Sequence, residues 1–471
     1  MIYPLESDEY QWAHATFGLC SLGDERNNAR LIQVAGALAL QPEGSFNAAF
    51  EGALSERLAA YRFVENDKIL VDDIVSGGVE PVAQLLRERS GKTILASEDT
   101  TNISYLHLSP HEELGPIGGP HDSKMQGFFV HSVFAFDEAT GEPLGLLHQQ
   151  YSTRAKGLVE TPHQKRPPSE RESYVWRASS EAISDRLGAA MADVVILCDK
   201  EADIYPLLDY KLQNNQRFVI GSKTNRRLEG RTEKLHDFVR QQPVRATYKL
   251  EIAQRGGRKK RTATLEIRDA AVRIKAPENV TDGSRSLEMW ALVITEKNPP
   301  KGVKPLSWKL LTSEDCSETQ TLLKIPQWYA KRWSIEEFHK VWKSGCKVEE
   351  LQMQTSSTLM RTAAILAFIA VRIYRIEYFA RTQPAASCLT ILTPDQLHCL
   401  WNKDNRKKPM PDTPPPVSWA YGAIARLAGW NDSKRTGKAS SITLWKGWQR
   451  LADLMIGWEL ARTFSEERIH G

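Results

Sequence analysis

The sequence predicts an α/β core that carries a β-rich insertion and is flanked by helical regions at both ends. Strand and helix patterns alternate over residues 92–221, residues 224–312 contain mainly strand patterns, and helical spacing dominates before and after these regions. The chain has 471 residues, of which 41% are hydrophobic and 25% charged. This length allows two or three domains, and the composition is that of a folded protein.

Charge and cysteine usage exclude several classes of protein. Lys and Arg (62) exceed Asp and Glu (58) by only 4, so a polyanionic partner must be bound by local basic patches. The six cysteines form no C-x-x-C pair, which argues against a zinc ribbon or a disulfide framework and favours a reducing compartment. The start MIYPLESDEYQ lacks the pattern of a signal peptide, and the longest apolar stretch, residues 363–371, is too short to span a bilayer.

The first 70 residues predict short helices. Residues 22–40 place Asp24 as a cap before apolar positions at helical spacing, and residues 55–64 form a second helical segment. Basic side chains recur on both segments: Arg26, Arg30, Arg57 and Arg62.

The middle of the chain predicts the α/β core and the insertion. The expected core elements are a strand at 92–99, a hairpin of 128–136 and 143–151, a helix at 173–191, a strand at 193–199, a helix at 203–212 and a strand at 217–221. Strands at 246–253, 262–268 and 289–295 follow in the insertion. Helices resume over about 314–382, and a Pro-rich linker at 406–416 precedes two last helices, 419–429 and about 444–464.

Acidic residues follow two of the predicted core strands. The first strand ends in Glu98 and Asp99, and the strand at 193–199 ends in Asp199, with Glu201 and Asp203 just beyond it. Acids at the ends of two strands of one sheet can converge at its edge, where their charges repel unless a cation lies between them. The pattern indicates a magnesium site. The alternative is that each Asp only ends its strand and caps the following turn.

The stretch YAKRWSIEEFHKVWKSG, residues 329–345, predicts one helix with a polar stripe. At about 100° per residue, one side of the helix collects Tyr329, Arg332, Glu336, His339, Lys340 and Lys343. Ile335, Phe338 and Trp342 share another side and can bury against the core. Glu336, rather than Glu337, is therefore the candidate third carboxylate. The alternative is a solvated helix with ion pairs such as Arg332 to Glu336.

These residues together resemble the DDE transposases of the bacterial insertion-sequence class. The resemblance extends along nearly the whole chain, from LGDERNNARL through SEDTTNISY, CDKEADI and YAKRWSIEEFHKVWKSG to WAYGAIARL and DSKRTG. Its most diagnostic part is the signature Y-x2-R-x3-E-x6-K behind two strand-terminal aspartates. The signature is formed here by Tyr329, Arg332, Glu336 and Lys343.

The resemblance implies an RNase H-like catalytic core of the retroviral-integrase superfamily. Asp99, Asp199 and Glu336 would form the catalytic, metal-binding triad, with two Mg²⁺ ions per active site and Mn²⁺ able to substitute. The implied reaction is cut-and-paste transposition of double-stranded DNA. The enzyme would bind terminal inverted repeats, cleave the ends through a hairpin intermediate and join the 3′ ends to target DNA.

The resemblance also implies DNA contacts near the cleavage point. Tyr329, Arg332 and Lys343 would hold phosphates, with Lys340 and His339 as weaker candidates from their positions on the helix. Trp308 matches a residue that stacks on a base flipped from the duplex, whereas a core tryptophan on a strand is the alternative.

Further contacts are implied away from the cleavage point. Arg26, Arg30 and Arg62 match positions that touch the terminal repeat, and Lys223 matches a lysine that contacts the DNA backbone. Ordinary surface charge is the alternative for these cations. The type member of the family carries Arg two positions before that lysine, where this chain has Gly221.

Three domains follow from the resemblance. Residues 1–70 would be a helical DNA-end-binding domain, 71–370 the RNase H-like core with its insertion at about 224–312, and 371–471 a helical dimerisation domain. We expect a bacterial, cytoplasmic, nucleoid-associated homodimer that assembles on the two ends, without membrane contact.

Two other functions remain open from the sequence. One is another RNase H-like nuclease such as a junction resolvase, against which Trp308 and the basic amino-terminal helices argue. The other is a non-catalytic, domesticated DNA-binding relative, which the presence of all three acids disfavours. Inverted terminal repeats flanking the reading frame would favour a mobile element over both.

Overall fold

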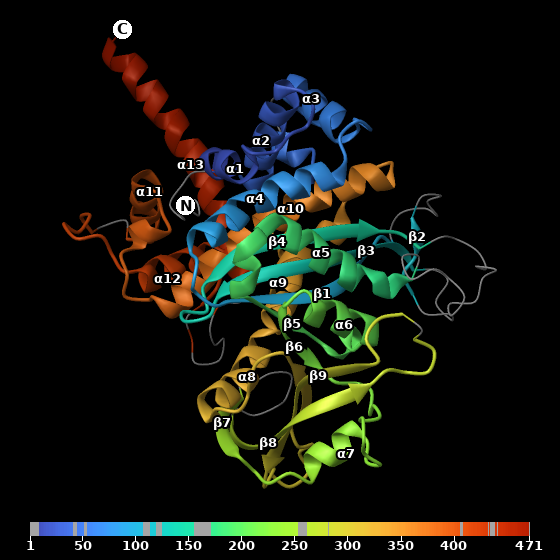
Figure 1. Cartoon of the computed structure of the whole chain (residues 1–471). Helices are drawn as coiled ribbons and strands as arrows, with labels where there is room; N and C mark the ends of the chain where they lie inside the picture. The colour runs from blue at the N-terminus through green and yellow to red at the C-terminus, as the bar shows by residue number, and fades with distance from the viewer. Residues whose placement is uncertain are drawn as a thin grey trace.

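The computed structural model describes most of the chain. The described ranges are 9–40, 45–50, 54–106, 114–118, 125–154, 171–252, 261–280, 282–405, 408–431, 433, 439 and 441–470. Figure 1 shows a twisted sheet at the centre, helices packed against it, a group of amino-terminal helices at one end and a long carboxy-terminal helix that projects from the body.

A single ten-stranded sheet organises the described residues. Its strand order is β2-β3-β1-β5-β6-β10-β9-β8-β7, and β4 pairs with β3. The strands are β1 (Ile94–Ser104), β2 (Gly115–Pro116), β3 (Gln126–Asp137), β4 (Pro143–Ser152), β5 (Val194–Cys198), β6 (Arg217–Gly221), β7 (Ala246–Ile252), β8 (Arg261–Lys275), β9 (Ser286–Lys297) and β10 (Ser307–Thr312).

The first half of the sheet is mixed, which is consistent with an RNase H-like core. β1 is antiparallel to β3 and parallel to β5, β5 is parallel to β6, and β3 and β4 form the predicted hairpin. Helices cover both faces of the central strands, which explains why these strands are nearly continuous apolar runs rather than alternating ones. The predicted α/β core is therefore confirmed.

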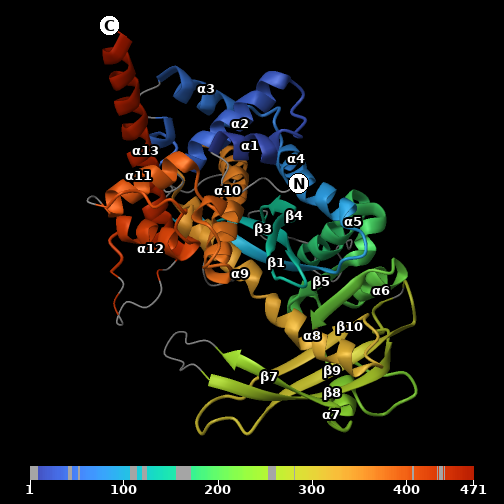
Figure 2. The same cartoon turned by 90° about the vertical axis from the view of Figure 1, so that its left-hand side faces the viewer.

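The β-rich insertion continues the same sheet rather than forming a sheet of its own. The chain leaves β6 at Gly221 and returns through β7, β8 and β9 to β10, which pairs with β6 from Leu310 to Thr312. Figure 2 shows these strands extending the core sheet away from the helical end regions. The segment is inserted in the sequence but joined to the core by backbone hydrogen bonds.

Among the described residues, the helices include all those predicted and four that were not specified, α1, α4, α7 and α11. Within the described ranges, none of them is long and apolar enough to cross a bilayer. Their bounds are α1 (Glu9–Phe17), α2 (Glu25–Leu40), α3 (Leu54–Val64), α4 (Val71–Glu88), α5 (Val175–Leu187), α6 (Tyr205–Gln213), α7 (Leu235–Arg240), α8 (Thr319–Lys331), α9 (Ser334–Lys340), α10 (Ser356–Thr382), α11 (Pro394–Asp404), α12 (Val417–Leu427) and α13 (Ser441–His470).

Two hydrophobic cores lie on the two faces of the sheet. Phe134 and Phe136 of β3 join the core that contains α9 and α10, whereas Val133 and Ala135 join the core that contains α5 and α6. All six cysteines are free and buried. The alternation along each central strand therefore sends neighbouring residues into different cores.

A buried arginine ties the amino-terminal helices to the body. The Arg361 guanidinium on α10 donates to the carbonyl oxygens of Val64 at 2.7 Å and Ile69 at 2.6 Å, just after α3. These bonds satisfy backbone groups at the end of a helix, where no intrahelical partner exists. The same long helix thus supports both the sheet and the amino-terminal region.

The segment 329–345 is helical but is not one regular α-helix, so that prediction is wrong in its geometry. α8 ends at Lys331, a turn at Arg332 and Trp333 precedes α9, and a π-helical turn, η7 (Val341–Gly345), follows α9. A pattern with a fixed angle per residue cannot detect such changes in helical pitch.

Candidate active site

Asp99 and Asp199 lie side by side at one edge of the sheet. β1 and β5 are parallel, with Glu98 opposite Cys198, so the next residue along each chain is an aspartate. Neighbouring strands are about 4.8 Å apart. β5 ends at Cys198 whereas β1 continues to Ser104, which leaves the edge of β1 beyond Asp99 without β5 as a neighbour. The register therefore places the two aspartates at neighbouring positions, one residue beyond the last paired residues of β1 and β5.

Asp199 also has the capping role that was its alternative. It precedes the short helix η6 (Lys200–Ala202), and its Oδ1 accepts the backbone N–H of Glu201 at 2.6 Å. Asp203 is different, because it is bonded to the backbone N–H groups of Lys223 and Thr224 at 2.8 Å and to Arg226 at 2.5 Å. Asp203 therefore anchors the chain after β6 and is fully engaged as a structural acid.

Glu336 reaches this edge from α9, which packs against β1. Arg332 is close enough to Asp99 to lower its pKa, and its Nη2 donates to Glu336 Oε1 at 2.9 Å. The ion pair proposed as the alternative for the stripe is thus present. It is a partly buried pair rather than a solvated one, since only 10% of the Arg332 side chain is exposed.

The pKa of Asp99 is shifted by burial and by the charges of neighbouring side chains. Burial is the main reason that the pKa of this carboxyl rises to about 6, and the negative charges of Asp199 and Glu336 raise it further. The Arg332 charge and the backbone N–H of Thr100 act in the opposite direction. The structure therefore brings all three predicted acids into mutual electrostatic range.

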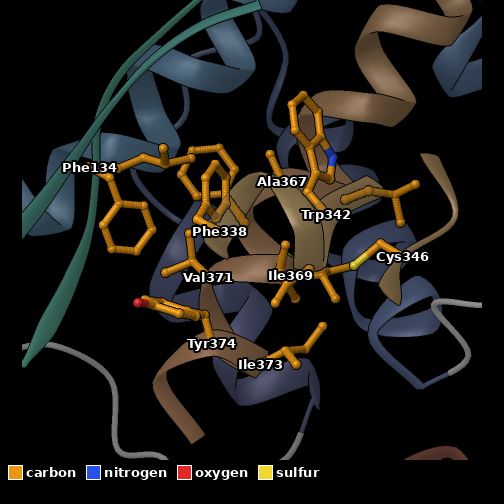
Figure 3. Packing of buried hydrophobic residues seen from close by; sticks show 14 of the residues in the cluster. Phe134, Phe338, Trp342, Cys346, Ala367, Ile369, Val371, Ile373 and Tyr374 are labelled. Carbon is orange, nitrogen blue, oxygen red and sulfur yellow. The ribbon is translucent and has the colours of Figure 1, made fainter. Parts of the chain in front are cut away.

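The apolar face of α9 fixes the direction of its polar side. Ile335, Phe338 and Trp342 are completely buried, as predicted. The rings of Phe338 and Phe134 have centroids 5.0 Å apart, and the indole N–H of Trp342 donates to the Ala363 carbonyl oxygen at 3.1 Å. Figure 3 shows this packing against α10. Because this face is held by the core, Glu336 on the other side of α9 faces the strand ends.

Tyr329 and Trp308 meet beside Asp199. Their rings are edge to face with centroids 5.7 Å apart, and both side chains are half-buried. A Cβ atom added at Gly221 would lie 2.8 Å from Tyr329 Oη and 2.9 Å from the Lys200 backbone nitrogen. The space next to Gly221 is therefore occupied by the Tyr329 hydroxyl and the chain after Asp199.

Lys343 points to the open edge of β1. Its Nζ donates to Asn102 Oδ1 at 3.3 Å and lies 3.5 Å from Glu349 Oε1. Glu349 also accepts the backbone N–H of Ser104 at 3.1 Å. The sequence pattern did not single out Glu349, because its partner Lys343 belongs to a π-helical turn whose direction the pattern does not encode.

The structure separates two neighbouring candidates on α9. Lys340 is exposed, whereas His339 is 6% exposed, and burial together with the Lys343 charge lowers its pKa to about 3. His339 Nε2 has no hydrogen-bond partner within the described ranges. A neutral, buried imidazole cannot contact a phosphate from this position.

The remaining predicted DNA contacts lie on other elements. Arg26 is exposed at the start of α2 and pairs with Asp24 at 2.7 Å. Arg30 is half-buried on α2, Arg62 is exposed on α3, and Lys223 is exposed just after β6. The amino-terminal arginines are thus grouped on one helical unit, apart from the strand ends that carry the acids (Figure 1).

Three parts of the chain match models of known protein families. Residues 9–69 match the family model described as Transposase DNA-binding, residues 164–372 match the Transposase DDE domain, and residues 368–468 match the Transposase Tn5 dimerisation domain. A chain with these three parts is a DNA transposase of the DDE class. More closely, it belongs to the Tn5-like DDE transposases, which carry out cut-and-paste transposition, and it binds DNA and forms dimers.

The match to the DDE domain contains Asp199 and Glu336 but begins after Asp99. The assignment of Asp99 as a candidate catalytic acid therefore depends on the register of β1 and β5.

Sequence analysis missed His131 of β3, which contacts Glu98 and Thr100 on either side of Asp99. A polar residue inside the apolar strand FFVHSVF was the available signal.

DDE transposases depend on a divalent metal ion, and the acids of this site fit one by their chemistry. Carboxylate oxygens are the ligands that hard divalent cations prefer, and a cation would offset the burial and the neighbouring negative charges that together raise the pKa of Asp99. Among the described residues, no three His, Cys, Asp or Glu side chains are already gathered as a metal-binding group. Glu336 is instead bonded to Arg332.

Proposed function

We propose that Asp99, Asp199 and Glu336 are the catalytic carboxylates and would hold Mg²⁺, two ions per active site, with Mn²⁺ able to substitute. Such ions, when bound, activate the attacking oxygen and stabilise the leaving oxygen at phosphorus. The observation that carries this proposal is the parallel register that puts Asp99 beside Asp199 under α9. The raised pKa of Asp99 supports it, because this carboxylate already experiences the charges of the other two.

In the proposed reaction, water first nicks the transposon end. The freed 3′ hydroxyl attacks the opposite strand and forms a hairpin, a second water opens the hairpin, and the 3′ end then joins target DNA. One site can serve these steps because each is a displacement at phosphorus with the same geometry.

Tyr329, Arg332 and Lys343 are proposed to hold the phosphates around the scissile bond. Arg332 suits a bidentate contact, whereas Lys343 acts as a mobile point charge. Each of these cations now faces a carboxylate, Glu336 or Glu349, and would exchange it for a phosphate when DNA binds. Lys340 is an additional surface contact in this proposal.

Trp308 is proposed to stack on the base that leaves the duplex during hairpin formation. Its indole is half-buried against Tyr329 at the end of the sheet that carries Asp199, so part of the ring remains accessible next to the acids. An aromatic face offers stacking without requiring a particular base edge.

The two end regions are proposed to bind the transposon ends and to pair the protomers. Arg26, Arg30 and Arg62 would contact the terminal inverted repeat, and Lys223 the DNA backbone nearer the core. Residues 1–70, 71–370 and 371–471 are the corresponding domains, although α10 runs without interruption across the second boundary. The projecting helix α13 (Figures 1 and 2) supports a dimer. In the proposed dimer, each active site acts on the end held mainly by its partner.

Excision of a DNA fragment bounded by the repeats that flank the reading frame tests the proposal. With Mg²⁺ the purified protein should release the fragment with hairpin ends, seen on a denaturing gel as strands of double length. Trp308→Ala should retain the first nick but lose the hairpin. Trp290→Ala, which removes another half-buried tryptophan from the β-rich half, is the matched control. Nicking without any hairpin in the native protein would favour a simple nuclease instead.

A further inference from the structure

A second acid, Glu98, is buried on the face of β1 opposite to Asp99. Successive side chains of a strand point to opposite faces, so Glu98 lies in the core with α5 and α6. It is 1% exposed. Burying a carboxylate is costly unless it is paired and hydrogen-bonded, so the partners of Glu98 show what it stabilises.

The partners of Glu98 come from the two strands beside β1. Its Oε1 lies 2.8 Å from Nε2 of His131 on β3, and its Oε2 accepts the thiol of Cys198 on β5 at 3.4 Å. Lys211 of α6, which is completely buried, adds a positive charge nearby. Burial raises the pKa of Glu98, but His131, Lys211 and Ser179 together more than offset this effect and leave the pKa lowered.

Both contacts lead back to the catalytic aspartates. The other ring nitrogen of His131, Nδ1, lies 2.7 Å from Thr100 Oγ1, and the backbone N–H of Thr100 bonds to the Asp99 carboxylate. Cys198 is the residue immediately before Asp199. Glu98 is therefore linked to the residue after Asp99 and to the residue before Asp199.

We propose that Glu98 is a positioning residue that holds the ends of β1 and β5 together, so that Asp99 and Asp199 keep the spacing needed to share a divalent cation. This inference rests on the proposed function of the two aspartates. This tie adds to the backbone pairing of β1 and β5 and opposes the repulsion between two like charges at adjacent strand ends. Glu98 acts through His131 and Cys198, since it faces away from the cation and the DNA.

Glu98→Gln in the full-length protein bound to end DNA tests the proposal, because it keeps the side-chain volume and removes the charge. The probe is Mn²⁺ alone, whose free ion is measured by its electron paramagnetic resonance signal. The dissociation constant for Mn²⁺ should rise about tenfold, as is typical for groups that support metal ligands. Affinity for end DNA should remain within about twofold, since the residue does not touch DNA.

Asp269→Asn is the matched control, because Asp269 is a buried carboxylate paired with Arg245 at 2.8 Å in the β-rich half. It should lower the melting temperature and leave Mn²⁺ affinity unchanged. If Glu98→Gln merely weakens the fold, its Mn²⁺ affinity should match that of Asp269→Asn, and the positioning role would be wrong.

A pair of cysteine variants decides the question even if Glu98→Gln does not fold. Cys198→Ala removes the donor to Glu98 and should weaken Mn²⁺ binding, whereas Cys198→Ser keeps a donor and should restore most of it. Equal affinities in the alanine variant, the serine variant and the native protein would overturn the proposal. Excision by the native protein in Mg²⁺ separates that result from a failure of the proposed function, which would abolish excision altogether.

Discussion

The two halves of the sheet use arginine–glutamate pairs in opposite ways. In the β-rich half, Arg261 forms two bonds to Glu296, which also accepts the backbone N–H of Leu306 at 3.0 Å and is 2% exposed. At the strand ends of the core half, Arg332 forms one bond to Glu336, which is 36% exposed. The first glutamate is fully satisfied by the protein, whereas the second retains capacity for a ligand.

The pKa directions of neighbouring acids show the same contrast. Hydrogen bonding to Arg261 lowers the pKa of Glu296, so this acid stabilises the fold in its charged form. Burial, with Asp199 and Glu336 nearby, raises the pKa of Asp99 to about 6, so its charged form is disfavoured until a cation arrives. These two acids, one in each half, therefore differ in which charge state the folded protein favours.

The largest expected effect is on the rate of excision, which should depend on an acid in the core half of the sheet and not on one in the β-rich half. Asp99→Asn should slow excision by at least about 10²-fold while end binding is kept, because an amide cannot supply the anionic oxygen that a divalent cation prefers. Glu296→Gln should excise at close to the native rate. Excision on a plasmid substrate and a gel-shift assay measure the two properties, and normal excision by Asp99→Asn would remove this acid from the site.

A smaller effect is expected from arginines of the two halves. Arg332→Ala should weaken end binding about tenfold at low salt, and the slope of log affinity against log salt should fall by about one, because one phosphate contact is lost. Arg273→Ala, which removes an exposed arginine paired with Glu288 in the β-rich half, should leave the slope unchanged. Slower excision with an unaltered slope would mean that Arg332 orients Glu336 and does not hold a phosphate.

The smallest effect is on the stability of the metal-free protein. Because the folded-state pKa of Asp99 is raised from 3.8 to about 6, its charge costs stability above pH 6, and this cost disappears as the pH falls toward 4. Asp99→Asn should therefore raise the melting temperature at pH 7.5 by about 2 °C, with a smaller gain at pH 5.

Glu296→Gln should do the reverse. Its pKa is lowered, so its stabilising contribution is present at neutral pH and is lost only in acid. Differential scanning calorimetry in the presence of a chelator measures both shifts. A loss of stability in Asp99→Asn at pH 7.5 would show that the aspartate is compensated in the folded protein and would remove the contrast between the two halves.

The sequence by itself determined many of the helices and strands and the spacing of the candidate site residues. Apolar runs bounded by turns predicted β1, β3, β4, β5 and β6, and helical spacing predicted α2, α3, α5 and α6, because the side-chain period of each element is a local property. The spacing of Tyr329, Arg332, Glu336 and Lys343 carried the resemblance to DDE transposases. The buried side of this segment was equally local, since Ile335, Phe338 and Trp342 lie on one side at α-helical spacing.

Tertiary structure alone decided the contacts that connect distant segments. Three features depend on how strands and helices meet in space. They are the register that places Asp99 next to Asp199, the continuation of the sheet into the β-rich half, and the position of Tyr329 beside Gly221. The π-helical turn at Lys343 and the burial of His339 depend on how α9 fits its core. Local periodicity encodes which face of an element is apolar, whereas pairing partners and helical irregularities are set by packing over the whole molecule.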